Sequence, residues 1–212
     1  VTPTIEHDAL LFPNVAGDPI LRPLQREIRG ASAVSIDPAR MREPARSDSD
    51  PTAYLAPDGA NAPGVYRALQ RSAPLREAEL VRFLGAIAAD VVGVTPKRLG
   101  RGFDTFEFEQ RWRDEKGIDR TLRLSPSDMS DGTLRAFGIL LALEQEPAPP
   151  LLAIEEIESA IHPGALRVLI DALDLANGRS QLVVSTHSPE VLGHSRIMPE
   201  QIRIVRRDHG RT

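Results

Sequence analysis

The order of short apolar runs and longer amphipathic stretches after Ser125 limits the fold more than any other feature of this chain. The apolar run Leu151–Ile154 is followed by helical spacing of apolar residues over 166–173, and a second run lies at Gln181–Ser185. Strands that alternate with helices predict a parallel sheet with right-handed crossovers. The unbroken apolar run predicts a strand buried on both faces. We therefore expect an α/β fold, a parallel sheet with flanking helices.

Two further elements are expected in this half, and an antiparallel hairpin before it. Leu134–Gln145 is strongly apolar and predicts a buried helix, and Ile202–Val205 predicts a third strand. Strict alternation over Thr105–Trp112, a turn at 114–117 and a return at Thr121–Leu124 predict the hairpin.

The first ninety residues carry weaker patterns. Apolar residues at helical spacing predict a helix over Glu77–Val92. The segment Asp37–Pro63 is rich in Pro, Asp, Ser and Arg, which predicts a long loop. Shorter elements are expected as a helix at Leu21–Ile28, a strand at Ala33–Ile36 and a helical turn or two at Val65–Gln70.

Composition excludes several classes of protein. The chain has 212 residues, no cysteine and a net charge of −4, so disulfides, thiolate metal sites and a whole-domain basic surface for nucleic acid are excluded. Its apolar runs are far shorter than the ~20 residues that cross a bilayer. No secretory leader is visible at the start. We expect a cytoplasmic protein with no membrane partner.

Two adjacent acids, Glu155 and Glu156, follow the expected strand Leu151–Ile154. Ligands of open parallel sheets sit beyond the carboxyl ends of the strands, where these acids lie. Neighbouring residues of an extended chain point in opposite directions, so one carboxylate could serve a divalent cation and the other orient a water. Two solvated acids before a helix are an equally good interpretation of this dipeptide alone.

Two other polar segments stand beside expected elements. Ser185-Thr186-His187-Ser188-Pro189 follows the next strand, where a histidine can donate to a phosphate oxygen; an ordinary loop histidine is the alternative. Met129-Ser130-Asp131-Gly132-Thr133 opens the apolar helix. A helix N-terminus suits an anion, and Gly132 would let a partner approach the backbone; an ordinary N-cap at Ser130 or Asp131 is the alternative.

The order and spacing of these segments are more specific than any one of them. Over Leu124–Leu192 the chain resembles the SMC/RecF-like branch of the ABC ATPases, close to the group that includes the heads of OLD-type nucleases. The resemblance extends more weakly back to about residue 20. It implies the C-terminal lobe of an ABC head with a P-loop NTPase fold, and ATP and Mg²⁺ as cofactors.

The resemblance also implies roles for individual residues. Ser130, Asp131 and Gly132 match the signature that touches the ATP of a partner subunit, and Ser159 lies in the segment that matches the D-loop. Leu151–Glu155 matches the Walker B strand. Glu155 then assists the metal, Glu156 is the catalytic glutamate that polarises water, and His187 is the catalytic switch histidine. Ile157 replaces a usual proline, and Glu155 a usual aspartate.

One motif of such ATPases is missing. No Gly-x-x-x-x-Gly-Lys-Ser/Thr sequence occurs in the 212 residues, and this P-loop is what holds the β- and γ-phosphates. We expect it to precede Val1 in the parent protein. The expected organisation is a loop-rich lead-in at 1–64 with a short helix and strand, a helical segment and hairpin at 65–125, and the ATPase core with signature, Walker B, D-loop and switch histidine at 126–212.

The function expected from the resemblance is the C-terminal part of an ATP-hydrolysing protein that serves DNA repair or phage defence. Its partners would be a second copy in a head-to-tail homodimer and an effector protein or DNA. The alternative is a non-catalytic dimerisation or regulatory module derived from such an ATPase.

Overall fold

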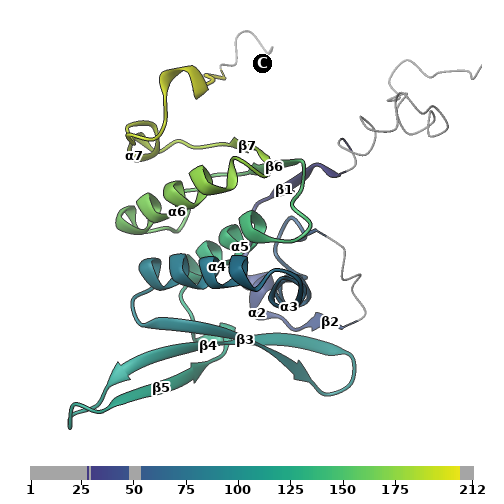
Figure 1. Cartoon of the computed structure of the whole chain (residues 1–212), viewed down its shortest axis with the longest axis vertical. Coiled ribbons are helices and arrows are strands. Elements are labelled where there is room, and N and C mark those ends of the chain that lie inside the picture. Colours follow the sequence, from purple (N-terminus) through teal and green to yellow (C-terminus); the bar gives the residue numbers. More distant parts are fainter. Residues whose placement is uncertain (1–27, 29, 48–53, 206–212) are drawn as a thin grey trace, which may run out of the picture.

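The computed structural model describes residues 28, 30–47 and 54–205, which form three layers (Figure 1). A parallel sheet lies at one side of the molecule, a layer of helices lies in the middle, and an antiparallel sheet lies at the other side. The expected α/β class, with a parallel sheet, flanking helices and an antiparallel hairpin, is confirmed.

The parallel sheet has the order β1–β6–β7. Its strands are β1 (Ser32–Val34), β6 (Leu151–Ile154) and β7 (Gln181–Val184). The expected strands at Leu151–Ile154 and Gln181–Ser185 are thus confirmed, and that at Ala33–Ile36 is displaced toward Ser32.

The helices cover one face of this sheet, so the expectation of burial on both faces is wrong. Leu152 and Ile154 point into the core, whereas Leu151 and Ala153 are half-buried and Val183 is 52% exposed. The third strand expected at Ile202–Val205 is also absent. Its backbone pairs with no described strand, and the side chains of Ile204 and Val205 lie largely in solvent.

Helix α5 (Asp131–Glu144) is the centre of the helical layer, and every residue from Leu134 to Glu144 is buried. Such all-round burial is what an apolar helix without a polar face requires. Gly138 allows α5 to approach the chain after β1 closely, because a Cβ there would lie 2.8 Å from Cγ2 of Ile36. Around α5 lie α2 (Pro38–Arg42), α3 (Ala62–Ser72), α4 (Pro74–Ile87) and α6 (Pro163–Ala176).

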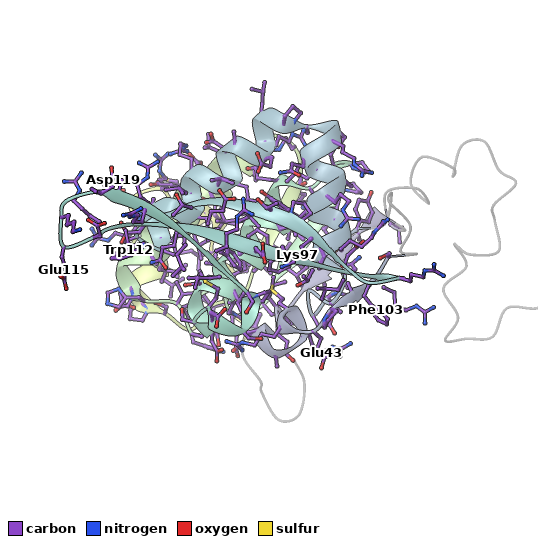
Figure 2. The ribbon with its side chains drawn as sticks, turned by 90° about the horizontal axis from the view of Figure 1, so that it is seen from below. Glu43, Lys97, Phe103, Trp112, Glu115 and Asp119 are labelled. Carbon is purple, nitrogen blue, oxygen red and sulfur yellow. The ribbon has the colours of Figure 1, made fainter. Side chains whose placement is uncertain are left out.

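The antiparallel sheet has the order β2–β4–β3, with β5 paired to β4. Its strands are β2 (Ala45–Arg46), β3 (Val91–Leu99), β4 (Phe103–Arg113) and β5 (Asp119–Leu124). The expected hairpin is β4–β5, and Figure 2 shows Trp112, Glu115 and Asp119 at its projecting end.

Strand β3 was not expected, and the helix expected over Glu77–Val92 ends at Ile87. Asp90 has a left-handed φ of 74°, which turns the chain out of the helix. Pro96 and the basic pair Lys97-Arg98 hide the strand pattern.

The long loop expected over Asp37–Pro63 is in part regular structure. It contains α2, whose N-terminus is capped by Asp37 Oδ1 accepting from Ala39 N at 2.8 Å, and β2. Met41 and Leu55 of this segment are buried in the core. Polar composition concealed these anchoring residues. The turns expected at Val65–Gln70 belong to the longer α3, and the helix expected at Leu21–Ile28 lies outside the described residues apart from Ile28.

Three short elements complete the described chain, the 3-10 helices η2 (Pro126–Asp128) and η3 (Pro199–Gln201) and helix α7 (Pro189–Leu192). One hydrophobic core includes buried residues from Val34 to Val191 and so draws on all three expected segments.

Phe137 of α5 is the hub of the aromatic part of this core. Its ring centroid lies 5.5 Å from that of Tyr66, 5.1 Å from Phe106 and 5.4 Å from Phe108. These three rings come from α3 and β4, so Phe137 joins the helical layer to the antiparallel sheet.

We predict that Phe137→Ala lowers the free energy of unfolding by about 3–5 kcal/mol, because it removes a fully buried ring and leaves a cavity. Urea denaturation followed by circular dichroism measures the change. Leu175→Ala is the control, since this side chain of α6 is 54% exposed and its loss should cost less than about 1 kcal/mol. Equal losses for the two variants would contradict the assignment of Phe137 as the hub.

Candidate functional site

The segments after β6 and β7 meet at the carboxyl end of the parallel sheet. Glu156 N donates to Ser185 Oγ at 3.0 Å, and Ile157 N donates to the Ser185 carbonyl at 3.3 Å. Ser185 therefore joins the acidic segment to the histidine segment, because its backbone and its side chain both accept from the acidic one. This is the edge of the sheet at which ligands of parallel sheets bind.

The two adjacent acids lie at the surface. The side chains of Glu155 and Glu156 are both exposed, so neither carboxylate carries the cost of burial. Glu156 has a left-handed φ of 45°, a conformation that costs a residue with a Cβ on the order of 1 kcal/mol. The backbone is thus strained at the residue that the resemblance assigns to catalysis.

Glu158 organises the histidine segment, although the sequence did not single it out. Its carboxylate accepts from the hydroxyl of Thr186 at 2.7 Å and from the backbone N–H of His187 at 2.6 Å. Burial acts to raise the pKa of Glu158, but these two hydrogen bonds, together with one from its own backbone and the nearby His187, outweigh it and hold the pKa below its ordinary value. His187 itself is exposed at the surface.

The start of α5 is capped as an ordinary helix, by Ser130 rather than by Asp131. Ser130 Oγ accepts from Thr133 N at 3.2 Å and lies 2.9 Å from Thr133 Oγ1. Asp131 is engaged by Arg42 of α2, whose Nη2 lies 2.6 Å from Asp131 Oδ1 and 2.9 Å from the Met129 carbonyl. The arginine offsets the negative charge at the end of the helix, and both Ser130 and Asp131 remain exposed.

Gly132 brings the start of α5 against the segment after β6. A Cβ at this position would lie 2.6 Å from the carbonyl oxygen of Ala160. The backbone of Ala160 is left-handed, with a φ of 60°. The close approach expected at Gly132 is therefore made by the same chain. Next to it, Ser159 N donates to the Glu156 carbonyl at 2.9 Å. The structure thus brings all the expected site segments to one end of the sheet.

Two residues in the chain after β6, Ile157 and His162, also have structural roles. Ile157 is fully buried, so it anchors the turn after β6 through the core. His162 caps α6, because its Nδ1 accepts from Gly164 N at 3.1 Å.

Arg135 was also missed by the sequence reasoning. Its guanidinium lies inside the molecule and donates to carbonyl oxygens after β1 and β6. The available signal was a single arginine within the otherwise apolar stretch Leu134–Leu143.

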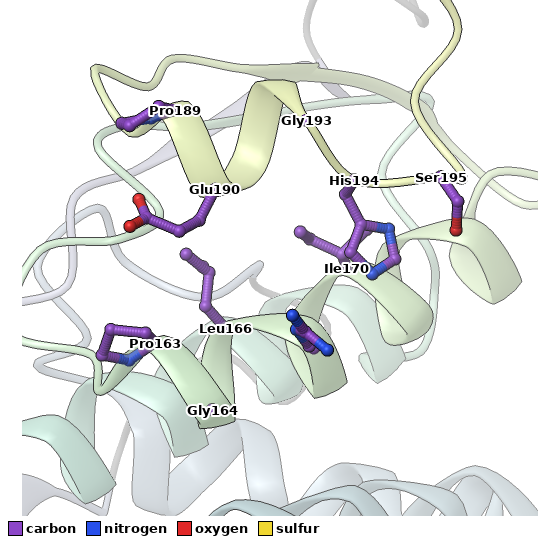
Figure 3. A pocket seen from close by; sticks show the side chains of 10 residues that line it. Pro163, Gly164, Leu166, Ile170, Pro189, Glu190, Gly193, His194 and Ser195 are labelled. Atoms are coloured by element: carbon purple, nitrogen blue, oxygen red, sulfur yellow. The ribbon is translucent and has the colours of Figure 1, made fainter.

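A groove of about 730 Å³ lies beside this site, between α6 and α7 (Figure 3). Glu190 and His194 project from the α7 side, and Leu166 and Ile170 project from α6. None of the expected site residues lines the groove, so it is separate from the carboxyl end of β6.

Among the described residues, no three His, Asp or Glu side chains gather closely enough to hold a metal by themselves. Mg²⁺ takes one or two carboxylates and fills its other positions with waters and phosphate oxygens, so exposed Glu155 and Glu156 fit that ion only together with a phosphate ligand. Within the same ranges of the chain, no helix combines the length and the apolar character needed to cross a bilayer.

A family model described as "AAA domain, putative AbiEii toxin, Type IV TA system" matches residues 87–193. The match covers about half of the 212 residues, from the end of α4 to the residue after α7, and includes every expected site residue. No curated protein matches the chain.

We predict that Glu158→Gln loosens the histidine segment, because an amide oxygen replaces two carboxylate acceptors and one hydrogen bond, about 1 kcal/mol, is lost. The stabilisation by ionised Glu158 is complete above its ordinary pKa of 4.5 and is lost as the pH falls through its lower pKa in the folded state. The difference in unfolding free energy between the two proteins should therefore be constant above pH 4.5 and shrink below it.

Urea denaturation at pH 7 and at several values below pH 4.5 measures this difference. Glu115→Gln at the exposed end of the β4–β5 hairpin is the matched control and should change nothing at either pH. A difference that grows on acidification would contradict the role given to Glu158.

Proposed function

Because the chain belongs to the AAA-domain family described above, a family of nucleotide-binding ATPase-type domains, we propose that these residues form the hydrolytic half of an ATPase site. Within this proposal the domain is the C-terminal lobe of an SMC/RecF-like ABC head. Hydrolysis of ATP to ADP and phosphate takes place at the carboxyl ends of β6 and β7.

One observation carries the proposal. Glu155 and Glu156 leave β6, His187 follows β7, and these segments are tied together by Ser185 and Glu158. A phosphate at the end of adjacent parallel strands would meet both the acids and the histidine. Such convergence from different strands is what phosphoryl transfer needs, since its catalysis rests on positioning and electrostatics.

Each of these side chains has a role that its chemistry supports. Glu156 accepts a hydrogen bond from the attacking water and orients it toward the γ-phosphorus. His187 donates a ring N–H to a γ-phosphate oxygen. Glu155 would hold Mg²⁺, which neutralises charge on the phosphates when bound. The exposure of all three side chains leaves them accessible to a nucleotide.

The start of α5 serves a second site in the proposal. Ser130 and Asp131 are exposed at the N-terminus of a fourteen-residue helix, and half-buried Gly132 and Ser159 lie beside them. The free N–H groups and positive dipole end of a helix favour a phosphate. In a head-to-tail homodimer this surface would contact the ATP held by the other subunit, and Arg42 offsets the charge of Asp131.

In this proposal the grip on the phosphates comes from residues other than these 212, in which no P-loop sequence occurs. The sheet has room for an added strand, since β7 pairs among the described residues with β6 alone. We also propose that the ATPase acts on an effector protein or on DNA, in DNA repair or phage defence. A non-catalytic dimerisation module is the other outcome that the experiments below distinguish.

We predict that the 212-residue chain by itself binds ATP–Mg²⁺ weakly or not at all, because it has no P-loop sequence, whose backbone N–H groups and lysine hold the β- and γ-phosphates. Isothermal titration calorimetry with ATP and Mg²⁺ measures the affinity. A dissociation constant in the micromolar range would mean that the phosphate grip lies within these residues after all.

We predict that Glu156→Gln, made in a form of the protein that includes a phosphate-binding loop, lowers kcat at least about 100-fold while ATP binding persists. The amide keeps the size of the side chain and loses the charge that polarises water. Released phosphate and ATP binding are measured separately, and the ATP-bound dimer should accumulate in gel filtration. Unchanged turnover would remove Glu156 from its role and favour the non-catalytic module.

A further inference from the structure

Arg135 of α5 joins three backbone segments from inside the molecule. Its Nη1 donates to the Ile36 carbonyl at 2.6 Å, and its Nη2 donates to the carbonyls of Glu155 at 3.0 Å and Glu156 at 3.1 Å. The rigid fork of a guanidinium suits several acceptors at fixed angles, which a lysine ammonium does not match. The chain after β1, the chain after β6 and α5 therefore meet at one side chain.

The burial of this cation is costly. Arg135 is only 8% exposed, and its Nε lies inside the protein without a hydrogen-bond partner. It forms no ion pair with any described residue, so its charge is directed at carbonyl oxygens. Burial lowers the pKa of Arg135, and the carboxylates of Glu156 and Glu158 act against this shift. A methionine of similar length would fill the space at a lower desolvation cost, so packing alone does not account for an arginine here.

Two of the carbonyls that Arg135 contacts belong to Glu155 and Glu156, so they lie in the backbone that carries the Glu156 side chain. Glu156 holds a left-handed φ of 45°, which persists only where the surroundings enforce it. Ser185 Oγ accepts from the N–H of Glu156, and Arg135 donates to its carbonyl. Ser159 N donates to the same carbonyl at 2.9 Å, so the residue is held on both sides, and Arg135 is the side chain that ties its carbonyl to α5.

We propose that Arg135 is a positioning residue, which holds Glu156 in its strained conformation and thereby aims the carboxylate at the site beyond β6. Its catalytic consequence rests on the proposed function, because it requires Glu156 to orient the attacking water. The structural consequence, that Arg135 keeps the backbone of residues 155–160 in place, does not depend on the proposed function.

The structural consequence is tested on the 212-residue chain by amide hydrogen exchange in Arg135→Lys and Arg135→Met. We expect exchange at 155–160 to become at least about 10-fold faster in Arg135→Met, and less so in Arg135→Lys, while the core of α5 stays protected. Arg179→Met is the matched control, since Arg179 donates to the Leu143 carbonyl and pairs with Glu144 near the other end of α5. Unchanged exchange at 155–160 in folded Arg135→Met overturns the proposal.

The catalytic consequence is tested in a form of the protein that includes a phosphate-binding loop. Arg135→Lys should lower kcat about 10- to 100-fold and leave KM within about twofold, because it misplaces a group that acts in the transition state. Arg179→Lys should leave both constants unchanged. Thermal denaturation verifies that the variants are folded at the assay temperature.

The outcomes separate the two proposals. An active wild-type protein whose kcat is unaffected by Arg135→Lys contradicts the positioning role and leaves the proposed function standing. A wild-type protein without ATPase activity contradicts the proposed function. In that case the hydrogen-exchange result alone supports or overturns the role of Arg135 in holding the backbone of residues 155–160. Loss of kcat together with faster exchange at 155–160 supports both.

Discussion

Burial of α5 on all sides is the constraint on which the rest of this structure depends. An apolar helix without a polar face has to be enclosed, and here β6 lies against it on one side, α4 and α6 pack along it, and the rings of β4 cover Phe137 on the other. The parallel sheet and the antiparallel sheet are therefore held on opposite sides of one helix. The position of the parallel sheet, and with it the candidate site, follows from this enclosure.

The same helix also organises the site, through polar groups at its N-terminal end. Ser130 caps it, Gly132 admits the carbonyl of Ala160, and Arg135 reaches the carbonyls after β6 one turn later. The candidate catalytic segment is thus mounted on the core rather than on a free loop. Rigid mounting of this kind is what positioning of a catalytic group requires. The exposed faces of Glu155, Glu156 and His187 are left for a ligand.

Prediction from sequence succeeded where local pattern and burial agree. The strand Leu151–Ile154 could be predicted because its apolar run is unbroken. The helix after it and the β4–β5 hairpin could be predicted because the spacing of their apolar residues is regular. Strand β3 was missed because Pro96 and charged residues interrupt its pattern, although β4 still pairs with it. The segment Ile202–Val205 has the composition of a strand and lacks a partner, so its apolar side chains stay in solvent.

The sequence by itself determined the order of the elements after Ser125 and the identity of the acids, the histidine and the signature-like turn beside them. Those features depend on neighbours in the chain, so a local pattern suffices to find them. Only the tertiary structure decided that Glu158 holds the His187 segment and that Arg135 holds the carbonyl of Glu156. These contacts join residues about twenty to thirty positions apart, and their geometry arises only when α5, β6 and β7 are packed together.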